Sequence, residues 1–180
     1  MFLSVGSLAA LAMGLLSWAP TLLVRNFAFG LSDAGIAMGS VGVPAGIAGT
    51  VCAPIIVRRL ALRLGHSSTP FVIGVSALLA GISLVIGLMS GETVIFLVSL
   101  GITYMFLSAA MVMPAIVIQE ASPPAMRARL MATHLLSLGL LGQGLGPFIV
   151  ARMSDQIGGI EGLPKALILI ALVAPTIAMI

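Results

Sequence analysis

Long apolar segments separated by short groups of charged residues run through the whole sequence. The segments without Asp, Glu, Lys or Arg are residues 1–24, 34–57, 64–91, 93–119, 130–151 and 166–180. A helix needs about 20 mostly apolar residues to cross a hydrocarbon core of about 30 Å. Five segments meet this length, and the sixth approaches it when Leu163, Pro164 and a snorkelling Lys165 are added. The pattern predicts an all-α membrane protein with six transmembrane helices, the last of them truncated at Ile180.

The composition excludes a water-soluble protein. Apolar residues make up 60% of the 180 residues and charged residues 7%, whereas soluble domains carry about 25% charged residues. A soluble enzyme, a nucleic-acid-binding protein and a disordered chain are therefore excluded. We expect membrane lipid as a partner, no cofactor and no metal site, because no Cys/His cluster has the spacing of a metal site. The single cysteine, Cys52, lies in an apolar run and is predicted to be a small buried apolar residue.

Basic residues indicate the orientation in the cell membrane. The second and fourth connections share one side and carry five basic residues and one acidic residue, whereas the other side carries three basic and four acidic residues. Because Lys and Arg are enriched on the cytoplasmic side, the first group is predicted to be cytoplasmic, together with both termini. That group consists of Arg58, Arg59, Arg63, Glu120, Arg127 and Arg129.

Glycines spaced four residues apart predict where helices pack closely. Without a Cβ, a glycine lets a neighbouring backbone approach, which is one way in which helices associate in lipid. Prolines within the spans permit kinks that neighbouring helices satisfy. The predicted packing residues are Gly35, Gly39, Gly42, Gly46, Gly142, Gly146 and Pro147.

An internal repeat is predicted at an offset of 93 residues. This offset aligns five pairs of residues: Gly46 with Gly139, Gly49 with Gly142, Pro54 with Pro147, Arg59 with Arg152, and Gly65 with Gly158. The offset spans three helices, an odd number, so the two copies (residues 1–91 and 92–180) are expected to lie inverted in the membrane. Inverted three-helix repeats are the building units of many secondary transporters.

Several segments resemble major facilitator superfamily transporters, with the spinster-like and related organic-solute branches closest. Residues 18–25 and 30–35 resemble the seventh helix of that family and its following loop, and residues 122–129, 142–147 and 154–155 resemble the eleventh helix and the loop before it. The resemblance covers essentially the whole chain and implies helices seven to twelve of a twelve-helix transporter. It also implies that a first six-helix half completes the protein, either in the same chain or as a second subunit.

The cytoplasmic loop after the second helix departs from the family pattern. Residues 58–65 take the place of a loop in which the family carries an Asp, and Arg58 stands at that position. The gating role of that carboxylate is therefore not transferred to this chain. Glu120 with Arg127 or Arg129 is a second candidate for a gate, and an ordinary solvated loop is the alternative.

Four polar or aromatic residues are candidates for a substrate cavity. Trp18 and Tyr104 are the only Trp and Tyr, and His134 and Gln143 lie within the fifth span. The resemblance implies that all four lie on helices that line the central cavity. The alternatives are an interfacial anchor for Trp18 and helix-to-helix hydrogen bonds or packing for the others. Each Asp, Glu, Lys and Arg lies at or near a span end, so no proton-carrying carboxylate is predicted at mid-membrane.

The leading hypothesis is one half of a secondary active transporter that moves a small organic solute by alternating access. A half-size membrane subunit that acts as a homodimer is an alternative. An intramembrane hydrolase would require a serine paired with His134, for which Ser108 and Ser137 are the only suggestions. Since no Gly-x-Ser-Gly turn occurs, we predict that the protein is not an enzyme and has no catalytic residues.

Overall fold

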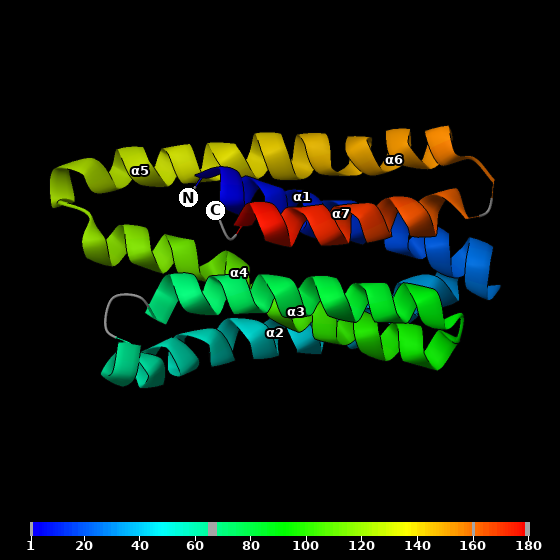
Figure 1. The fold of residues 1–180 in the computed structure, drawn as a ribbon, viewed down its shortest axis with the longest axis horizontal. Coiled ribbons are helices and arrows are strands. Elements are labelled where there is room, and N and C mark those ends of the chain that lie inside the picture. The colour runs from blue at the N-terminus through cyan, green and yellow to red at the C-terminus, as the bar shows by residue number, and fades with distance from the viewer. Residues whose placement is uncertain (1, 65–67, 160, 179–180) are drawn as a thin grey trace.

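The chain is helical throughout the residues that the computed structural model describes, namely 2–64, 68–159 and 161–178, apart from short connections. The helices are α1 (Phe2–Phe27), α2 (Leu31–Leu64), α3 (Ser68–Ser90), α4 (Thr93–Ala121), α5 (Pro124–Ser137), the π-helix η2 (Leu138–Leu145), α6 (Gly146–Ile157) and α7 (Gly162–Ala178). They run roughly along one direction (Figure 1). The predicted all-α class is confirmed.

Five helical segments of the described chain are long and apolar enough to cross a membrane. These are α1, α2, α3, α4 and the continuous segment α5–η2–α6, whose 34 residues run from Pro124 to Ile157. Helix α7 includes Leu163, Pro164 and Lys165 as predicted, but its 17 residues stay below the length of a typical span. The architecture is that of a membrane protein with five long apolar helices and a shorter sixth.

Two helices extend well beyond the predicted apolar segments. Helix α2 continues to Leu64 and carries Arg58 and Arg59 on its last turns, and α5 begins at Pro124, before Arg127. A helix satisfies its own backbone groups, so it can continue into water where its side chains become charged. Proline at the start of α5 suits this position, because the first helical residues have no intrahelical partner for their N–H.

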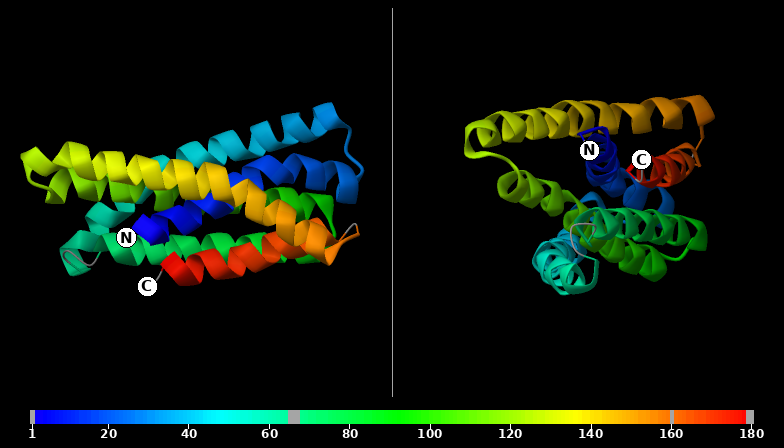
Figure 2. Two further views of the ribbon diagram at one scale, coloured as in Figure 1. Left: turned by 90° about the horizontal axis from the view of Figure 1, so that it is seen from above. Right: turned by 60° about the vertical axis from the view of Figure 1, so that its left-hand side comes forward.

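Both chain ends lie at the same end of the bundle as the cationic connections. The start of α1, the end of α7 and the α4–α5 connection share this end in Figure 1 and in the left view of Figure 2. The end of α2 also lies there. The other end holds the connections α1–α2, α3–α4 and α6–α7, in which Ala28, Gly91 and Gly158 have positive φ. The structure thus gathers the predicted cytoplasmic residues of the described chain at one end.

The serines of α3 lie on its covered side, and its exposed side is apolar. The hydroxyl of Ser83 donates to the carbonyl of Ser99 at 3.0 Å, and the hydroxyl of Thr103 on α4 donates to the carbonyls of Ser99 and Ala80 at 2.8 and 3.3 Å. The exposed stripe of α3 is entirely apolar: Phe71, Val75, Leu79, Ile82 and Ile86. This arrangement suits a helix that contacts lipid, because the hydrocarbon offers no hydrogen-bond partners.

The helix contacts divide into pairs that match across the two halves of the chain. Helix α2 packs on α4, and the α5–η2–α6 segment packs on α1. Helix α3 packs on α4, and α7 packs on α1. Helices α3 and α7 contact each other, and α1 contacts α4. The buried core extends through α1, α3, α4 and α7, and its largest side chains include Leu15, Leu84, Phe96, Leu100 and Leu167.

Candidate functional site

Helix α2 and the α5–η2–α6 segment are much less covered than the other spans. Only 11% of the apolar window of α2 and 22% of that of α5–η2–α6 is buried, against 44% in α1, α3 and α4. The buried side of α2 is a narrow stripe of small or flexible residues, namely Ala34, Met38, Gly49 and Ala53. Most other residues of α2 are exposed, including Cys52, so the prediction that Cys52 is buried is wrong.

Gln143 lies on the uncovered side of the fifth segment. Among the exposed residues of η2, Gln143 has the strongest hydrogen-bonding capacity. Its side-chain amide makes no hydrogen bond to another residue of the described chain. It stands 14 residues before the end of α6, about 21 Å along the helix at 1.5 Å per residue, well inside the span. A free amide at this depth is unfavourable against lipid and favourable against a water-filled or protein-lined space.

The π-helical turn around Gln143 has a clear local cause. Pro147 has no backbone N–H, so the helix must rearrange its hydrogen bonds in the residues before it. The preceding segment contains Gly139, Gly142 and Gly144, which have no side chain to resist the wider turn. Wider turns of this kind often occur at functional sites. The glycine-rich run before Pro147 is the sequence signal for this turn, from which close packing but no wider turn was predicted.

Trp18 makes a contact between two helices. Its indole N–H donates to the carbonyl oxygen of Pro147 at 3.0 Å, and its ring is half-buried against the core. Because an indole nitrogen has one donor and no acceptor, this bond uses all of its polar capacity. Trp18 therefore holds α1 against α6, and its N–H is not free for a substrate.

We expect Trp18→Phe to lower the free energy of unfolding by about 1 kcal/mol. The carbonyl of Pro147 loses its indole donor while an aromatic ring still occupies most of the space. Thermal unfolding in detergent, followed by circular dichroism, measures the change. An unchanged unfolding midpoint would show that this bond contributes nothing to stability.

Tyr104 packs its ring where Gly42 leaves room. A Cβ at Gly42 would come within 3.3 Å of the ring carbon Cδ2 of Tyr104. The hydroxyl of Tyr104 is buried and has no hydrogen-bond partner. A buried hydroxyl without a partner costs about 1–3 kcal/mol. The Tyr104 hydroxyl therefore has unused hydrogen-bonding capacity within the described chain.

Removing the hydroxyl of Tyr104 provides a matched comparison for the Trp18→Phe variant. We expect Tyr104→Phe to leave thermal stability unchanged or raise it slightly, because the deleted group makes no bond. The same unfolding measurement applies. A loss as large as that of Trp18→Phe would mean that the hydroxyl of Tyr104 has a stabilising partner.

His134 is the one buried residue of α5 and has an unpaired ring nitrogen. Its side chain is 2% exposed, and its Nδ1 has no hydrogen-bond partner. The nearby hydroxyl of Ser137 donates to the carbonyl of Thr133 at 2.9 Å and does not pair with the imidazole. The structure therefore provides no serine and histidine pair at this position.

The four cavity candidates do not form one cluster. Trp18 is bonded to Pro147, Tyr104 lies against Gly42, His134 is buried on α5, and Gln143 is exposed on η2. No hydrogen bond among the described side chains joins any two of them. Three of the four offer a polar group without a partner.

The described charged side chains at the end of the bundle with the cationic connections are exposed and make no ion pair with one another. Arg127 donates from Nε to the carbonyl of Ser122 at 2.9 Å within its own connection. Glu120 and Arg129 are exposed and make no ion pair within the described chain, which favours the solvated-loop alternative. Arg58 and Arg59 are exposed as well, whereas the side chain of Arg63, together with Gly65, lies outside the described residues.

One exposed ion pair lies at the other end of the bundle. Lys165 donates to the carboxylate of Glu161 one helical turn away. This hydrogen bond, supported by the charge of Lys165, lowers the pKa of the Glu161 carboxyl. An exposed pair of this kind adds little to stability.

Four of the glycines predicted to pack closely do meet a neighbouring helix. A Cβ at Gly146 would lie 2.5 Å from the carbonyl oxygen of Ala10, and one at Gly142 would lie 2.7 Å from the Cβ of Ala9, so both pack closely against α1. Gly42 and Gly46 meet side chains of α4 at 3.3 and 3.4 Å.

Gly35 and Gly39 do not pack within this chain. Nothing lies within 4 Å of a Cβ built at either position, although Gly42 and Gly46 on the same side of α2 meet α4. The prediction for this pair is wrong within the described chain. Gly49 was not among the predicted packing residues, but a Cβ there would overlap the backbone of α4 at Met105.

The described residues contain no group of three or more His, Cys, Asp or Glu side chains that could hold a metal ion. Comparison of the sequence with models of known protein families gives no match, and comparison with curated proteins gives none either. The functional interpretation therefore depends on the geometry of the chain itself.

Proposed function

We propose that the chain is one six-helix half of a secondary active transporter of the major facilitator type, moving a small organic solute across the cytoplasmic membrane by alternating access. One observation carries the proposal. The poorly covered spans expose small and polar groups among their apolar side chains, whereas the exposed stripe of α3 is purely apolar. Lipid suits the second surface, and a polar cavity or another protein unit suits the first.

The matched helix contacts support an inverted repeat. Exchanging α1 with α4, α2 with α5–η2–α6 and α3 with α7 turns each main contact into another observed contact. The aligned glycines agree in part, since Gly49 and Gly142 are both positions where a helix closely approaches its neighbour. Transporters built from such repeats bind substrate near the membrane centre, at the interface of the repeat units.

The partner that completes the cavity would cover α2 and the α5–η2–α6 segment. A first six-helix half is the partner we propose, and a second copy of this chain is the alternative. Gly35 and Gly39 lie open on α2, where the backbone of another helix could approach closely. Gln143 then faces the shared space between the two units.

The exposed and unpaired groups suggest the substrate class. Gln143 offers a donor and an acceptor on the uncovered surface, and the described spans present no carboxylate near their centres. Such a surface favours an organic solute with a few hydrogen-bonding groups over one with a high charge. Hydrolysis is not part of the proposal, because His134 is not paired with a serine.

Cysteine accessibility tests this proposal. In a Cys52→Ala background, Gln143→Cys and Ser40→Cys are compared with Leu79→Cys and Ile82→Cys on the apolar stripe of α3. The probe is a membrane-impermeant, charged methanethiosulfonate reagent, which requires a hydrated thiolate. We expect the first pair to react and the second pair to stay inert. Equal inertness of all four positions would refute a hydrated cavity at α2 and η2.

A further inference from the structure

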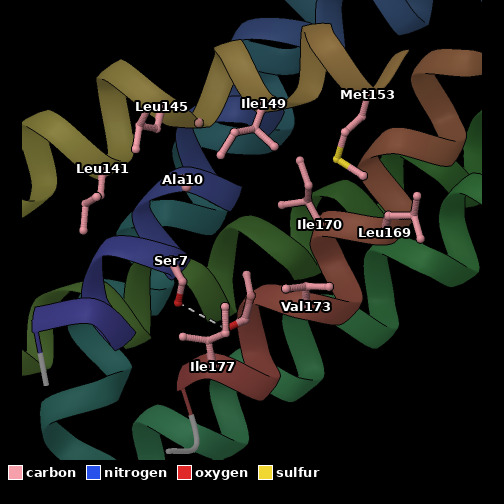
Figure 3. Close-up of a pocket in the computed structure, with 12 residues that line it drawn as sticks. Ser7, Ala10, Leu141, Leu145, Ile149, Met153, Leu169, Ile170, Val173 and Ile177 are labelled. Carbon is pink, nitrogen blue, oxygen red and sulfur yellow. Dashed lines mark hydrogen bonds between the residues drawn. The ribbon is translucent and has the colours of Figure 1, made fainter. Parts of the chain in front are cut away.

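An elongated apolar groove lies on the flank of the bundle, between α1, the η2–α6 segment and α7. Its volume is about 530 Å³, within the range of about 300–1,000 Å³ that is typical of ligand sites. Figure 3 shows its side chains arranged along the helices, with Leu141, Leu145, Ile149 and Met153 on one wall. Leu169, Ile170, Val173 and Ile177 of α7 line the facing wall.

The groove offers no free polar side chain. Ser7 carries the only side-chain hydroxyl of the lining, and this group donates to the carbonyls of Ser4 and Ala174 at 2.8 and 3.3 Å. A polar ligand would lose its hydration here without gaining a hydrogen bond from a side chain. The lining therefore selects a hydrocarbon ligand.

The length of the groove matches one leaflet of a bilayer. Leu169 and Ile177 are eight residues apart on α7, about 12 Å along the helix axis. Half of the hydrocarbon core of a bilayer measures about 15 Å. The groove runs along the helix axes, as an acyl chain does among transmembrane helices.

The floor of the groove depends on a close contact between α1 and α6. Gly146 lies against the backbone of Ala10, and both residues belong to the lining. This contact brings the helices together at the base, while the larger side chains further out hold the walls apart. Gln143 lies two residues from both Leu141 and Leu145, so helical periodicity places it on the opposite side of η2. The groove is separate from the proposed substrate surface.

We propose that this groove is a binding site for one acyl chain of a membrane phospholipid. The lipid fills the space between α1, α6 and α7 and supports the packing of the short helix α7. This role holds whether or not the chain is half of a transporter. The occupant is a phospholipid because these helices lie among phospholipid chains and the groove accepts hydrocarbon alone.

The test uses matched pairs of variants that differ in whether the changed residue lines the groove. Val173 and Leu172 are 52% and 53% exposed on α7, but only Val173 belongs to the lining. Val173→Phe fills the groove, and Leu172→Phe enlarges the neighbouring lipid-facing surface. Leu145→Phe and Leu140→Phe form a second pair on η2, where only Leu145 lines the groove.

Native mass spectrometry measures binding of palmitoyl-oleoyl-phosphatidylcholine to the delipidated protein in detergent. We expect one lipid per chain for the wild type, for Leu172→Phe and for Leu140→Phe, and binding at least about tenfold weaker for Val173→Phe and Leu145→Phe, because the added rings take the space of several methylene groups. Equal lipid binding by the two variants of either pair, or no lipid bound to the wild type, would overturn the proposal.

A fluorescence measurement on the same variants guards against misfolding. Trp18 is the only tryptophan, and its indole is bonded to Pro147, the neighbour of the lining residue Gly146. In the wild type, we expect phosphatidylcholine with brominated chains to quench the fluorescence of Trp18 to a saturating level. In Val173→Phe, this saturating phase should be lost. The Trp18 emission maximum without lipid should be the same in both proteins. Identical quenching curves would contradict the site.

Discussion

Replacing Gly49 with alanine is expected to produce the largest loss of stability of any single added methyl group on α2. The backbone of α4 at Met105 occupies the space that a Cβ at Gly49 requires, and Gly49 itself is buried. Backbone atoms cannot move aside as a flexible side chain can, so α2 and α4 must separate. Overpacking of this kind costs about 1–3 kcal/mol, and more where the backbone resists.

Gly39→Ala is the matched control on the same helix. No atom lies within 4 Å of a Cβ at Gly39, so the added methyl group meets no part of the described chain. Alanine also favours a helix over glycine by about 1 kcal/mol. Thermal unfolding in detergent should therefore show a lower midpoint for Gly49→Ala and an equal or higher midpoint for Gly39→Ala. Equal shifts in the two variants would mean that α2 and α4 do not cross at Gly49.

Truncation of Phe96 is expected to have the second large effect. Phe96 is fully buried on the first turn of α4, and its ring stacks on Phe27 of α1 with the ring centroids 4.9 Å apart. Phe96→Ala leaves a cavity between α1 and α4 and removes the aromatic pair. Such truncations cost about 3–5 kcal/mol in protein cores. The cost of the cavity remains in a membrane protein, because lost van der Waals contacts are not replaced.

Phe148→Ala is the control for this change. Phe148 is 59% exposed on α6, so its removal leaves no internal cavity. Unfolding midpoints measured in the same detergent should fall strongly for Phe96→Ala and little for Phe148→Ala. A small effect at Phe96 would contradict a close contact between α1 and α4 at this level.

The sequence predicted the helices well because charged groups are excluded from hydrocarbon. Ions are costly in lipid, so the uncharged segments mark the spans, and α3 and α4 begin or end within a few residues of the predicted limits. The same rule underestimated the lengths of α2 and α5. Helix α2 continues past Arg58 and α5 begins before Arg127, because a helix tolerates charged side chains where it leaves the hydrocarbon.

The glycine pattern could not reveal where along α2 the neighbouring helix comes close. Gly35, Gly39, Gly42, Gly46 and Gly49 are spaced by three or four residues, so they lie on one side of the helix. Gly42, Gly46 and Gly49 meet α4, whereas nothing lies within 4 Å of a Cβ at Gly35 or Gly39. Cys52 was mispredicted for a different reason, because an apolar run in a membrane helix does not separate a buried side from an exposed side.

Polar side chains in the spans carried a different kind of ambiguity. The sequence identified Trp18, Tyr104, His134 and Gln143 by their rarity in apolar segments, but not what each one contacts. Trp18 uses its N–H on Pro147, whereas the Tyr104 hydroxyl and His134 Nδ1 have no partner. These outcomes depend on contacts between α1 and α6 and between α2 and α4, which involve residues far apart along the chain.

Two-sided access to position 143 tests the central claim most directly. The measurement is the rate at which a charged, membrane-impermeant methanethiosulfonate reagent modifies Gln143→Cys in the Cys52→Ala background, applied from one side of oriented vesicles or from the other. If the chain is half of an alternating-access transporter, the reagent should react from either side. A ligand or condition that favours access from one side should slow the reaction from the other side. Reaction from a single side under every condition, or no reaction at all, would contradict the account.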